Sequence, residues 1–539
     1  MMNFNAAASD ERTRWDFFVN HTDDDTGYNH MVWRQTDGGL YTGLDPPAGA
    51  KRLGIWYPRT GTLGGCAMHN GGVVTLPADA DWNYIANITG DAGWLSKNMR
   101  PHYIKLERNS GVAVTDTTHG HNGFLDITLG DNSWINGDAD VIVLAERAAN
   151  LTGATGTPAS LLALMNRDIN ADDPKRDQTT GIYGGWTHST KAGLRSSPGY
   201  YVLDTVNDPA KYPLTVQLNS LVTKVIFDNS TVPKAIGVEY LRGQNVYSAD
   251  PRHKSSDKGT PGKAFATREV ILAAGTFNSP QILLLSGIGP SAELKALNIP
   301  IIVDSPGVGQ NLDDNYEGSV ASLAAQDLQG AAGIVMVFLK TSQSQGTRDI
   351  HMWCGQLSFE GFWPGFPTDY GPKQFECTFV HMNPRNQKGY VRLRSTDPTD
   401  TPEINLKFWE QNADKDLAAM MEGIKFGRDV MKDIPPELKG PYTEFHPCKT
   451  ANCTDAEAAA FIKKQVYSHH ATSTCAIGSD GNKMAVLDSK FRVRGVKGLR
   501  VVDASTFPKV PGSFPVIPTM MLSEKATFDI LSALNGTME

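Results

Sequence analysis

The sequence predicts an α/β protein of at least two domains, and three observations support this fold class. The chain has 539 residues, more than a single hydrophobic core usually holds. An apolar run, Val270–Gly275, is followed by Ser279-Pro280, which are expected to be the N-cap and first turn of a helix. Likewise, a short strand, Leu499–Val502, precedes a helix that we expect to begin at Pro518 or Thr519 and to run through Lys525. In contrast, Gly389–Arg394 alternates as an antiparallel strand does. Strands that feed helices indicate an α/β layer, and the alternating strand indicates a separate antiparallel sheet.

The composition excludes several classes of partner. The formal net charge is −8, which argues against nucleic acid or an anionic membrane surface as a partner. The longest stretch without charge, 270–292, contains glycine, proline, asparagine, serine and glutamine throughout. We therefore expect no membrane span.

The cysteines and glycosylation sequons leave the localisation open. Six cysteines are too few for a disulfide scaffold, and Cys448 and Cys453 either form one bridge or remain two free thiols. No signal peptide is recognised in the chain. Six Asn-x-Ser/Thr sequons favour secretion only weakly, because chance gives several in a chain of this length: Asn20, Asn87, Asn150, Asn229, Asn452 and Asn535.

The stretch from Tyr467 to Ala526 carries three linked blocks. They are His470-Ala-Thr-Ser-Thr-Cys475, Leu499-Arg-Val-Val-Asp-Ala-Ser505 and a helix that ends in Glu524-Lys-Ala526. This pattern resembles the C-terminal part of the glucose–methanol–choline (GMC) family of FAD-dependent oxidoreductases, and the resemblance extends from about Trp56 to the C-terminus. It implies FAD as cofactor, a small-molecule alcohol as substrate, and oxygen or another electron acceptor.

The resemblance also implies an architecture. It predicts a doubly wound FAD-binding domain from residues 1–312 and 468–539, and an α+β substrate-binding domain, 313–467, built on an antiparallel sheet. Within the first domain, Gly287–Ala292 fits the loose dinucleotide pattern G-x-G-x-x-A. We reject a nucleotide site there, because the helix expected after it, 293–298, is too short for a βαβ crossover.

A glycine-rich stretch, Pro58–Val73, resembles the first family signature, in which a Gly-Gly turn lies against the flavin. Gly64-Gly-Cys-Ala-Met-His-Asn70 matches the choline-oxidase-like branch, where the histidine is bonded covalently to FAD. His69 is therefore expected either to form that bond or simply to pack and hydrogen-bond. The cofactor contacts implied by the resemblance are Thr62, Gly65, His69, Asn70, Gly71, Val222, Asp503, Ala504 and Thr519.

Alcohol oxidation needs a base for the hydroxyl proton, and His470 matches the family's histidine for that role. His469 precedes it and is expected to hydrogen-bond His470 or the flavin edge. Many members carry a second His or Asn before the last helix, where this chain has Phe514, which can neither accept a proton nor donate a hydrogen bond. Three alternatives stay open: His469 takes the partner role, substrate is held by shape, or activity is lost. Frequent aromatic residues between 338 and 370 suggest an apolar or aromatic substrate.

The family pattern contains a strand–GxGxxG–helix unit that cradles the FAD pyrophosphate, and this chain has no GxGxxG. The first βαβ unit is therefore expected to be absent, and we predict that residues 1–539 alone fold poorly and retain little FAD. Two alternatives to an alcohol oxidase or dehydrogenase follow: a non-catalytic chain that cannot hold FAD, and a flavin-containing lyase on the same fold.

Overall fold

The computed structural model describes residues 4–330, 333–448 and 453–534, and a six-stranded sheet forms one half of it. Every neighbouring pair in this sheet is antiparallel, as predicted. One of its strands, β7, lies outside the predicted range 313–467. In sheet order the strands are β21 (Thr443–His446), β15 (Tyr316–Leu323), β18 (Gln374–His381), β17 (Ile350–Gly355), β16 (Val335–Leu339) and β7 (Gly181–Tyr183).

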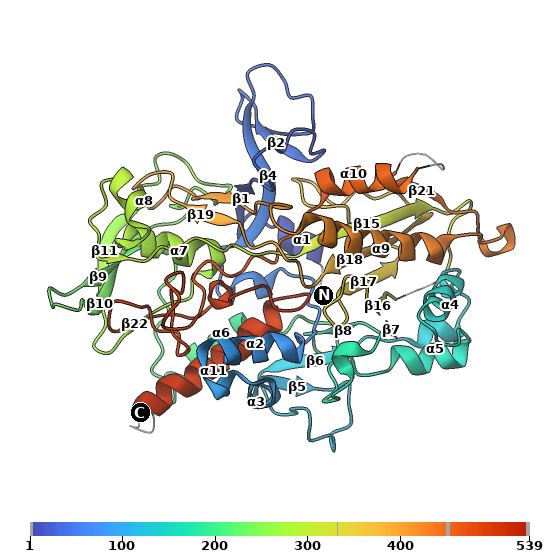
Figure 1. The fold of residues 1–539 in the computed structure, drawn as a ribbon, viewed down its shortest axis with the longest axis horizontal. Coiled ribbons are helices and arrows are strands. Elements are labelled where there is room, and N and C mark those ends of the chain that lie inside the picture. The colour runs from blue at the N-terminus through green and yellow to red at the C-terminus, as the bar shows by residue number, and fades with distance from the viewer. Residues whose placement is uncertain (1–3, 331–332, 449–452, 535–539) are drawn as a thin grey trace.

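Helices cover the six-stranded sheet, which is why β15 and β18 are buried along almost their whole length. α9 (Ala413–Met431) packs on these two strands. Glycine at position 423 allows the helix to come close to β18, because a Cβ on Gly423 would lie 2.8 Å from the Phe379 ring. Figure 1 shows α10 (Asp455–Gln465) along the top of this half, and α4 (Ile142–Leu151) and α5 (Pro158–Met165) at its lower right. α4 also contacts α9.

The other half contains the predicted parallel pairing. β12 (Val270–Leu272) pairs in parallel with β22 (Leu499–Val501), and each strand leads to a helix, α7 (Gly275–Leu285) and α11 (Val516–Leu534). The α/β class is therefore confirmed. Beside this pair lies an antiparallel sheet of β9 (Ser220–Phe227), β10 (Ala235–Arg242) and β11 (Thr260–Phe265).

Both helices begin earlier than predicted. α7 starts at Gly275, so Pro280 lies inside it rather than in its first turn. Proline cannot bond the carbonyl four residues back, but that carbonyl, on Thr276, accepts a hydrogen bond from Thr474 Oγ1 at 2.6 Å. α11 begins at Val516, and Pro518 is tolerated there because first-turn N–H groups have no helical partner. The predicted burial of the β12 strand is also wrong at Ile271, which is 45% exposed.

The N-terminal region forms a four-stranded sheet that projects at the top of Figure 1. Its long central strand, β4, ends at Thr60 and so delivers the glycine-rich turn to the middle of the molecule. The strands, in sheet order, are β1 (Arg14–Val19), β4 (Lys51–Thr60), β2 (Met31–Arg34) and β3 (Leu40–Thr42).

Shorter elements complete the fold. α8 (Ser291–Ala296) has six residues, consistent with rejecting a βαβ unit at Gly287–Ala292. α3 packs against α11. The remaining bounds are α1 (Phe4–Ser9), α2 (Asp79–Thr89), α3 (Ser96–Leu106), α6 (Pro198–Val206), β5 (Glu107–Asn109), β6 (Leu125–Leu129), β8 (Trp186–Thr187), β13 (Ile288–Gly289), β14 (Val303–Asp304), β19 (Tyr390–Arg392) and β20 (Glu403–Asn405).

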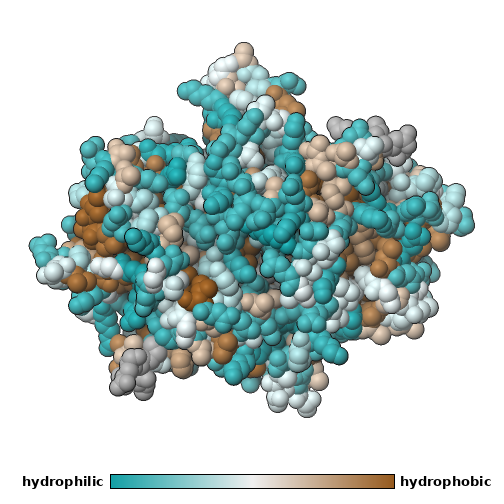
Figure 2. All heavy atoms as spheres, viewed as in Figure 1, coloured by the Kyte–Doolittle hydropathy of each residue, from teal (hydrophilic) through white to brown (hydrophobic). Residues whose placement is uncertain are grey.

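Disulfides join Cys448 to Cys453 and Cys354 to Cys377; the second pair lies directly opposite on β17 and β18. Two sequon asparagines, Asn452 and Asn535, fall outside the described residues. Among those described, none of the helices is both long enough and apolar enough to cross a membrane. The face in Figure 2 is largely hydrophilic with scattered apolar spots.

A buried charge cluster joins β5 to the loop that follows it. His119, which is 3% exposed, lies with Nδ1 2.9 Å from Glu107 Oε1 and Nε2 2.9 Å from Asp168 Oδ2. Burial alone would lower the pKa of His119, but the hydrogen bonds with Asp168 and Glu107 raise it to about 9. The imidazolium and its two carboxylates therefore stabilise the folded state at neutral pH.

This cluster predicts a loss of stability in alkali. Because the folded-state pKa lies above the ordinary value of 6.5, the contribution is complete below pH 6.5 and disappears as the pH rises through about 9. Its size is about 3 kcal/mol from the pKa difference. Urea unfolding across this range should show that fall in the wild type, and His119→Gln should be less stable at neutral pH with a flatter profile. Equal pH profiles for the two proteins would contradict the assignment.

Candidate active site

A cavity of about 1770 Å³ lies between the end of β4, β9, β12, the turn after β22 and the six-stranded sheet. It is larger than the ~300–1,000 Å³ of a typical ligand pocket. Its walls bring together residues that the sequence places hundreds of positions apart. Every predicted site residue lines it: Thr62, Gly65, His69, Asn70, Gly71, Val222, His469, His470, Asp503, Ala504, Phe514 and Thr519. Their individual roles remain predictions.

The glycine turn after β4 forms one wall. Gly64 and Gly65 have φ of 93° and 59°, which favour glycine, and a Cβ on Gly65 or Gly71 would have no neighbour within 4 Å. This backbone therefore leaves room for a flat ligand. His69 follows, 3% exposed, and its Nδ1 has no hydrogen-bond partner in the described part of the chain. A large cavity, an open glycine turn and an orphaned ring nitrogen together fit a flavin nucleotide.

Arg195 fixes the turn that carries His69, a role that the sequence did not reveal. Its guanidinium donates to Asn70 Oδ1 and to the Asn70 carbonyl oxygen, both at 2.7 Å, and to the Ala67 carbonyl oxygen at 3.1 Å. His188 Nε2 lies 3.1 Å from the same Asn70 Oδ1. No short motif marks Arg195, because its partners lie about 125 residues away.

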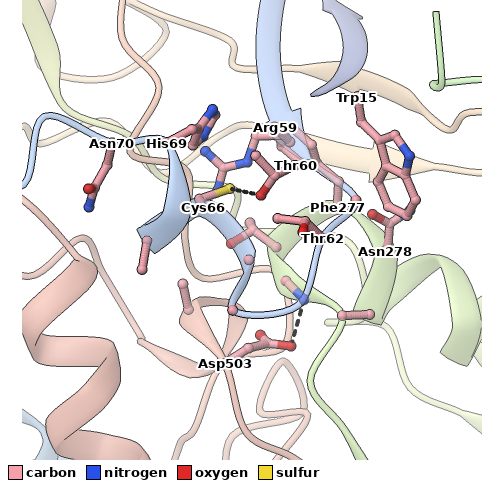
Figure 3. A pocket seen from close by; sticks show the side chains of 18 of the residues that line it. Trp15, Arg59, Thr60, Thr62, Cys66, His69, Asn70, Phe277, Asn278 and Asp503 are labelled. Carbon is pink, nitrogen blue, oxygen red and sulfur yellow. Dashed lines mark hydrogen bonds between the residues drawn. The ribbon is translucent and has the colours of Figure 1, made fainter. Parts of the chain in front are cut away.

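The opposite wall is held by internal hydrogen bonds. Asp503 accepts from the Gly275 amide at 2.9 Å and from the Ser505 amide at 2.8 Å, so it ties the β22 turn to the start of α7 (Figure 3). Thr519 Oγ1 donates to the Pro515 carbonyl oxygen at 2.6 Å. Val222 lies on β9, opposite Tyr240 of β10. At this wall a ligand would meet backbone and apolar surface more than free polar side chains.

Asp314 holds the two histidines in place. Its carboxylate accepts hydrogen bonds from Tyr57 Oη at 2.6 Å, from Ser468 Oγ at 2.5 Å and from the His470 amide at 2.8 Å. Tyr57 Oη in turn accepts from the Ala471 amide at 2.9 Å. Asp314 thus joins β4, the start of β15 and the histidine loop, a role that no sequence motif indicates.

Glu317 stands next to the histidines. A backbone bridge from the Glu317 amide to the Tyr467 carbonyl oxygen, at 2.9 Å, sets the histidine loop beside β15. Glu317 Oε1 lies 3.2 Å from His470 Nδ1 and 3.9 Å from His469 Nδ1. These three side chains place potential metal-ligand atoms within 4.8 Å of one another.

Burial sets the charge states in this group. It lowers the pKa of His470 to about 3, with a further contribution from Arg59, and lowers the pKa of His469 well below its ordinary value. Burial and then Asp314 raise the pKa of Glu317 well above its ordinary range. At neutral pH, therefore, both histidines are neutral, and the His470 ring carries one unprotonated nitrogen.

Phe514 packs edge-on against His470, with ring centroids 5.1 Å apart, and 5.3 Å from His351. His351 stacks between Phe338 and Trp353, and its Nε2 is buried without a partner among the described residues. Phe514 therefore contacts His351 as well as His470. Sequence reasoning missed His351, because it belongs to β17 rather than to the C-terminal motifs.

Comparison with known proteins identifies the family. The sequence profiles of GMC oxidoreductases match residues 48–317 and 384–523. The chain is 27% identical over 492 residues to choline oxidase of Arthrobacter globiformis, covering 89% of this chain and 82% of the relative. It is 28% identical over 501 residues to the oxygen-dependent choline dehydrogenase of Pseudomonas fluorescens (strain SBW25), covering 86% and 78%.

The fold agrees with this assignment. The crystal structure of pyridoxine 4-oxidase from Mesorbium loti superposes with a TM-score of 0.73 at 19% identity, over 98% of this chain and 90% of that one. At this level of identity the likeness concerns the fold alone.

The Asp314 contacts predict a graded loss of stability. Asp314→Asn should lower the free energy of unfolding by about 2–4 kcal/mol, because the amide keeps an acceptor oxygen on one side only. Either the Tyr57 hydroxyl at Oδ2 or the Ser468, His470 and Asn315 donors at Oδ1 would then lose their acceptor. Tyr57→Phe, which removes one hydroxyl at nearly the same volume, should cost about 1–2 kcal/mol. Urea unfolding at pH 7.5, well above the Asp314 pKa of about 6, measures both. An Asp314→Asn protein as stable as the wild type would show that these contacts do not hold the loop.

Proposed function

The chain belongs to the GMC oxidoreductase family of FAD-dependent enzymes acting on CH–OH donors, and we propose that it oxidises choline or a similar quaternary amino alcohol to the aldehyde. The observation that carries the proposal is Glu317, a carboxyl group 3% exposed at the wall of the cavity. This reading replaces the expectation of an apolar or aromatic substrate, which rested on the aromatic residues alone.

Aromatic rings surround the space that Glu317 faces. Trp353, Phe359 and Phe514 line the same cavity, and Trp353 and Phe514 meet edge to face at 5.3 Å. Strand register supports their proximity, since Trp353 lies opposite Thr378 and Thr378 opposite Ser319, two residues from Glu317 on β15. Aromatic faces around a carboxyl group are the chemistry that recognises a quaternary ammonium ion.

Electrostatics favours a cationic ligand for a second reason. Burial without a cation nearby favours the protonated form of a carboxyl group, whereas a nearby cation stabilises the carboxylate. A bound trimethylammonium group would supply that cation without a hydrogen-bond donor. The aliphatic chain of the alcohol would then extend its hydroxyl toward His470, which lies on the same side of Glu317.

His470 is the residue that we assign to proton transfer. His470 is neutral at neutral pH and accepts the hydroxyl proton as the carbinol carbon loses a hydride, so the alcohol loses two electrons and two hydrogens. Bound FAD supplies the hydride acceptor. Because His470 Nδ1 faces Glu317, its Nε2 is the nitrogen left for the substrate. The names of the relatives support oxygen as the final electron acceptor.

We assign the position of the flavin to the glycine turn, with His69 as its covalent attachment. This assignment is supported by the match of the sequence motif and by the buried, orphaned His69 Nδ1 at the cavity wall. Thr62, Gly65, Asn70 and Gly71 would flank the ring system, with Val222 nearer the nucleotide end and Asp503, Ala504 and Thr519 opposite.

Glu317→Gln tests the substrate class. The variant should raise KM for choline by about 10-fold or more, the equivalent of one charge-assisted contact. The matched control is the neutral carbon analogue of choline, in which a tert-butyl group replaces the trimethylammonium group; its KM should change little. Steady-state kinetics with both alcohols gives the comparison. Equal losses for the two substrates would remove Glu317 as the cation site.

His470→Ala tests the base. Anaerobic reduction of bound flavin by choline should slow by about 100-fold or more, because the hydroxyl proton has no acceptor. His469→Ala is the control at the neighbouring position, and its loss should be smaller. The flavin-to-protein ratio should be equal in the two variants. Near-normal reduction in His470→Ala would sink this assignment.

His69→Ala tests the attachment. After FAD-loaded wild-type protein is precipitated in acid, the yellow colour should stay with the polypeptide, whereas the variant should release its flavin to the supernatant. Mass spectrometry of the peptide containing His69 measures the adduct directly. Complete release of flavin from the wild type would refute the bond.

A further inference from the structure

Three side chains at the cavity wall have the composition and spacing of a transition-metal site. Glu317 Oε1 lies 3.2 Å from His470 Nδ1 and 3.9 Å from His469 Nδ1, and all three side chains offer ligand atoms within 4.8 Å of one another. Ligands arranged tetrahedrally around Zn²⁺ at bond lengths of about 2.0–2.2 Å are separated by about 3.3 Å. The closest pair already has this spacing, and a small rotation of the His469 ring brings its nitrogen into range.

The chemistry of this group is selective. Two imidazole nitrogens and one carboxylate oxygen are a ligand set typical of Zn²⁺, which keeps a further position for water or a small ligand. Within residues 4–330, 333–448 and 453–534, no other three histidine, cysteine or acidic side chains come this close together. All three line the cavity, so an ion can reach them from that side.

His470 Nδ1 supplies a second observation. The atom is buried and makes no hydrogen bond with any described residue, although Glu317 Oε1 lies only 3.2 Å away. A buried polar atom without a partner needs an explanation, and a neutral imidazole nitrogen is a common metal ligand. An ion between the two side chains would satisfy both atoms at once.

The backbone holds the three ligands in position before any ion binds. The Glu317 amide donates to the Tyr467 carbonyl oxygen at 2.9 Å, which sets the histidine loop beside β15. Ser468 Oγ donates to Glu317 Oε1 at 3.3 Å and so orients the carboxyl group from behind. Partners of this kind outside the ligand set raise metal affinity, because they fix the ligand atoms.

The charged groups around the site favour a cation on balance. Asp314 lies beside the histidine loop, where it accepts from the His470 amide at 2.8 Å, and it adds a second carboxyl group to that of Glu317. Arg59 opposes a cation, since its guanidinium donates to the His469 carbonyl oxygen at 3.0 Å. A dication therefore meets two carboxyl groups and one guanidinium.

We propose that Glu317, His469 and His470 bind Zn²⁺ and that the ion inhibits the enzyme by competing with the alcohol. Each histidine binds through Nδ1, the carboxylate binds through Oε1, and water fills the fourth position on the cavity side. The inhibition rests on the function proposed above, whereas the metal site itself does not.

Zinc would block oxidation for two reasons. A neutral imidazole that gives the Nδ1 lone pair to a metal carries its proton on Nε2, so His470 has no nitrogen left for the hydroxyl proton. The ion also takes the carboxylate of Glu317 and repels the trimethylammonium group of the substrate. Zinc and choline therefore exclude each other from the site.

Calorimetric titration of Zn²⁺ into the untagged, FAD-supplied chain, without alcohol, measures the site directly. The wild type should bind one equivalent, and His469→Ala and Glu317→Gln should each weaken binding by at least about 10-fold, because even the loss of a residue that only supports a ligand costs that much. His102→Gln is the control, since it removes a partly buried histidine on α3 that does not line the cavity. Equal affinity in all four proteins would show an adventitious ion only and would overturn the proposal.

X-ray absorption at the zinc edge gives a second readout that needs no activity. Wild-type protein with one equivalent of Zn²⁺ should show two imidazole nitrogens and a carboxylate oxygen at about 2.0–2.2 Å. His469→Ala should show one imidazole fewer. A wild-type spectrum with water oxygens alone around the ion would contradict the site.

Steady-state kinetics tests the competition. Zn²⁺ should raise KM for choline at unchanged kcat, and EDTA should restore the original KM. If the chain does not oxidise choline, calorimetry and X-ray absorption still decide the metal site, so the two proposals fail separately. Inhibition that saturating choline does not relieve, or an unchanged KM in zinc-loaded enzyme, would overturn the competition.

Discussion

The hydrogen bonds of Asp314 are the constraint on which the site depends. They join the hydroxyl of Tyr57 on β4 to Ser468 and to the His470 amide, and Tyr57 continues to the Ala471 amide. β4 also delivers the glycine turn with His69. One buried carboxylate therefore holds the glycine-turn wall and the two histidines in a common frame, although these segments lie about 400 residues apart.

Burial then determines what the histidines and Glu317 can do. Burial keeps His470 neutral, with one ring nitrogen unprotonated, and disfavours the charged form of Glu317. A cationic substrate would stabilise the charged form of Glu317 by pairing with its carboxylate, and it would leave His470 unprotonated. A quaternary amino alcohol thus suits both groups at once, whereas a neutral aromatic alcohol would bring no opposite charge to Glu317, whose Oε1 accepts a hydrogen bond from Ser468 Oγ at 3.3 Å.

Local motifs allowed part of the site to be predicted from the sequence. His69 and His470 lie within short blocks whose spacing carries the information, and the short helix α8 excluded a nucleotide fingerprint at Gly287. Asp314, Glu317, Arg195 and His351 could not be found in this way, because each matters through a contact far along the chain. The early start of α7 could not be predicted for the same reason, a contact with a residue far along the chain. The Thr276 carbonyl accepts a hydrogen bond from Thr474, 198 residues away.

The most direct measurement is the visible absorbance of flavin bound to this chain when choline is added without oxygen. The chain should be supplied with FAD, separated from free cofactor and then mixed with choline. Against the sequence-based expectation that this chain retains little FAD, a cavity that holds the cofactor beside Glu317 and His470 predicts rapid bleaching of the bound flavin and its return when oxygen is admitted. Bound flavin that stays oxidised with choline, or a chain that takes up no FAD when it is supplied, would contradict the proposed function.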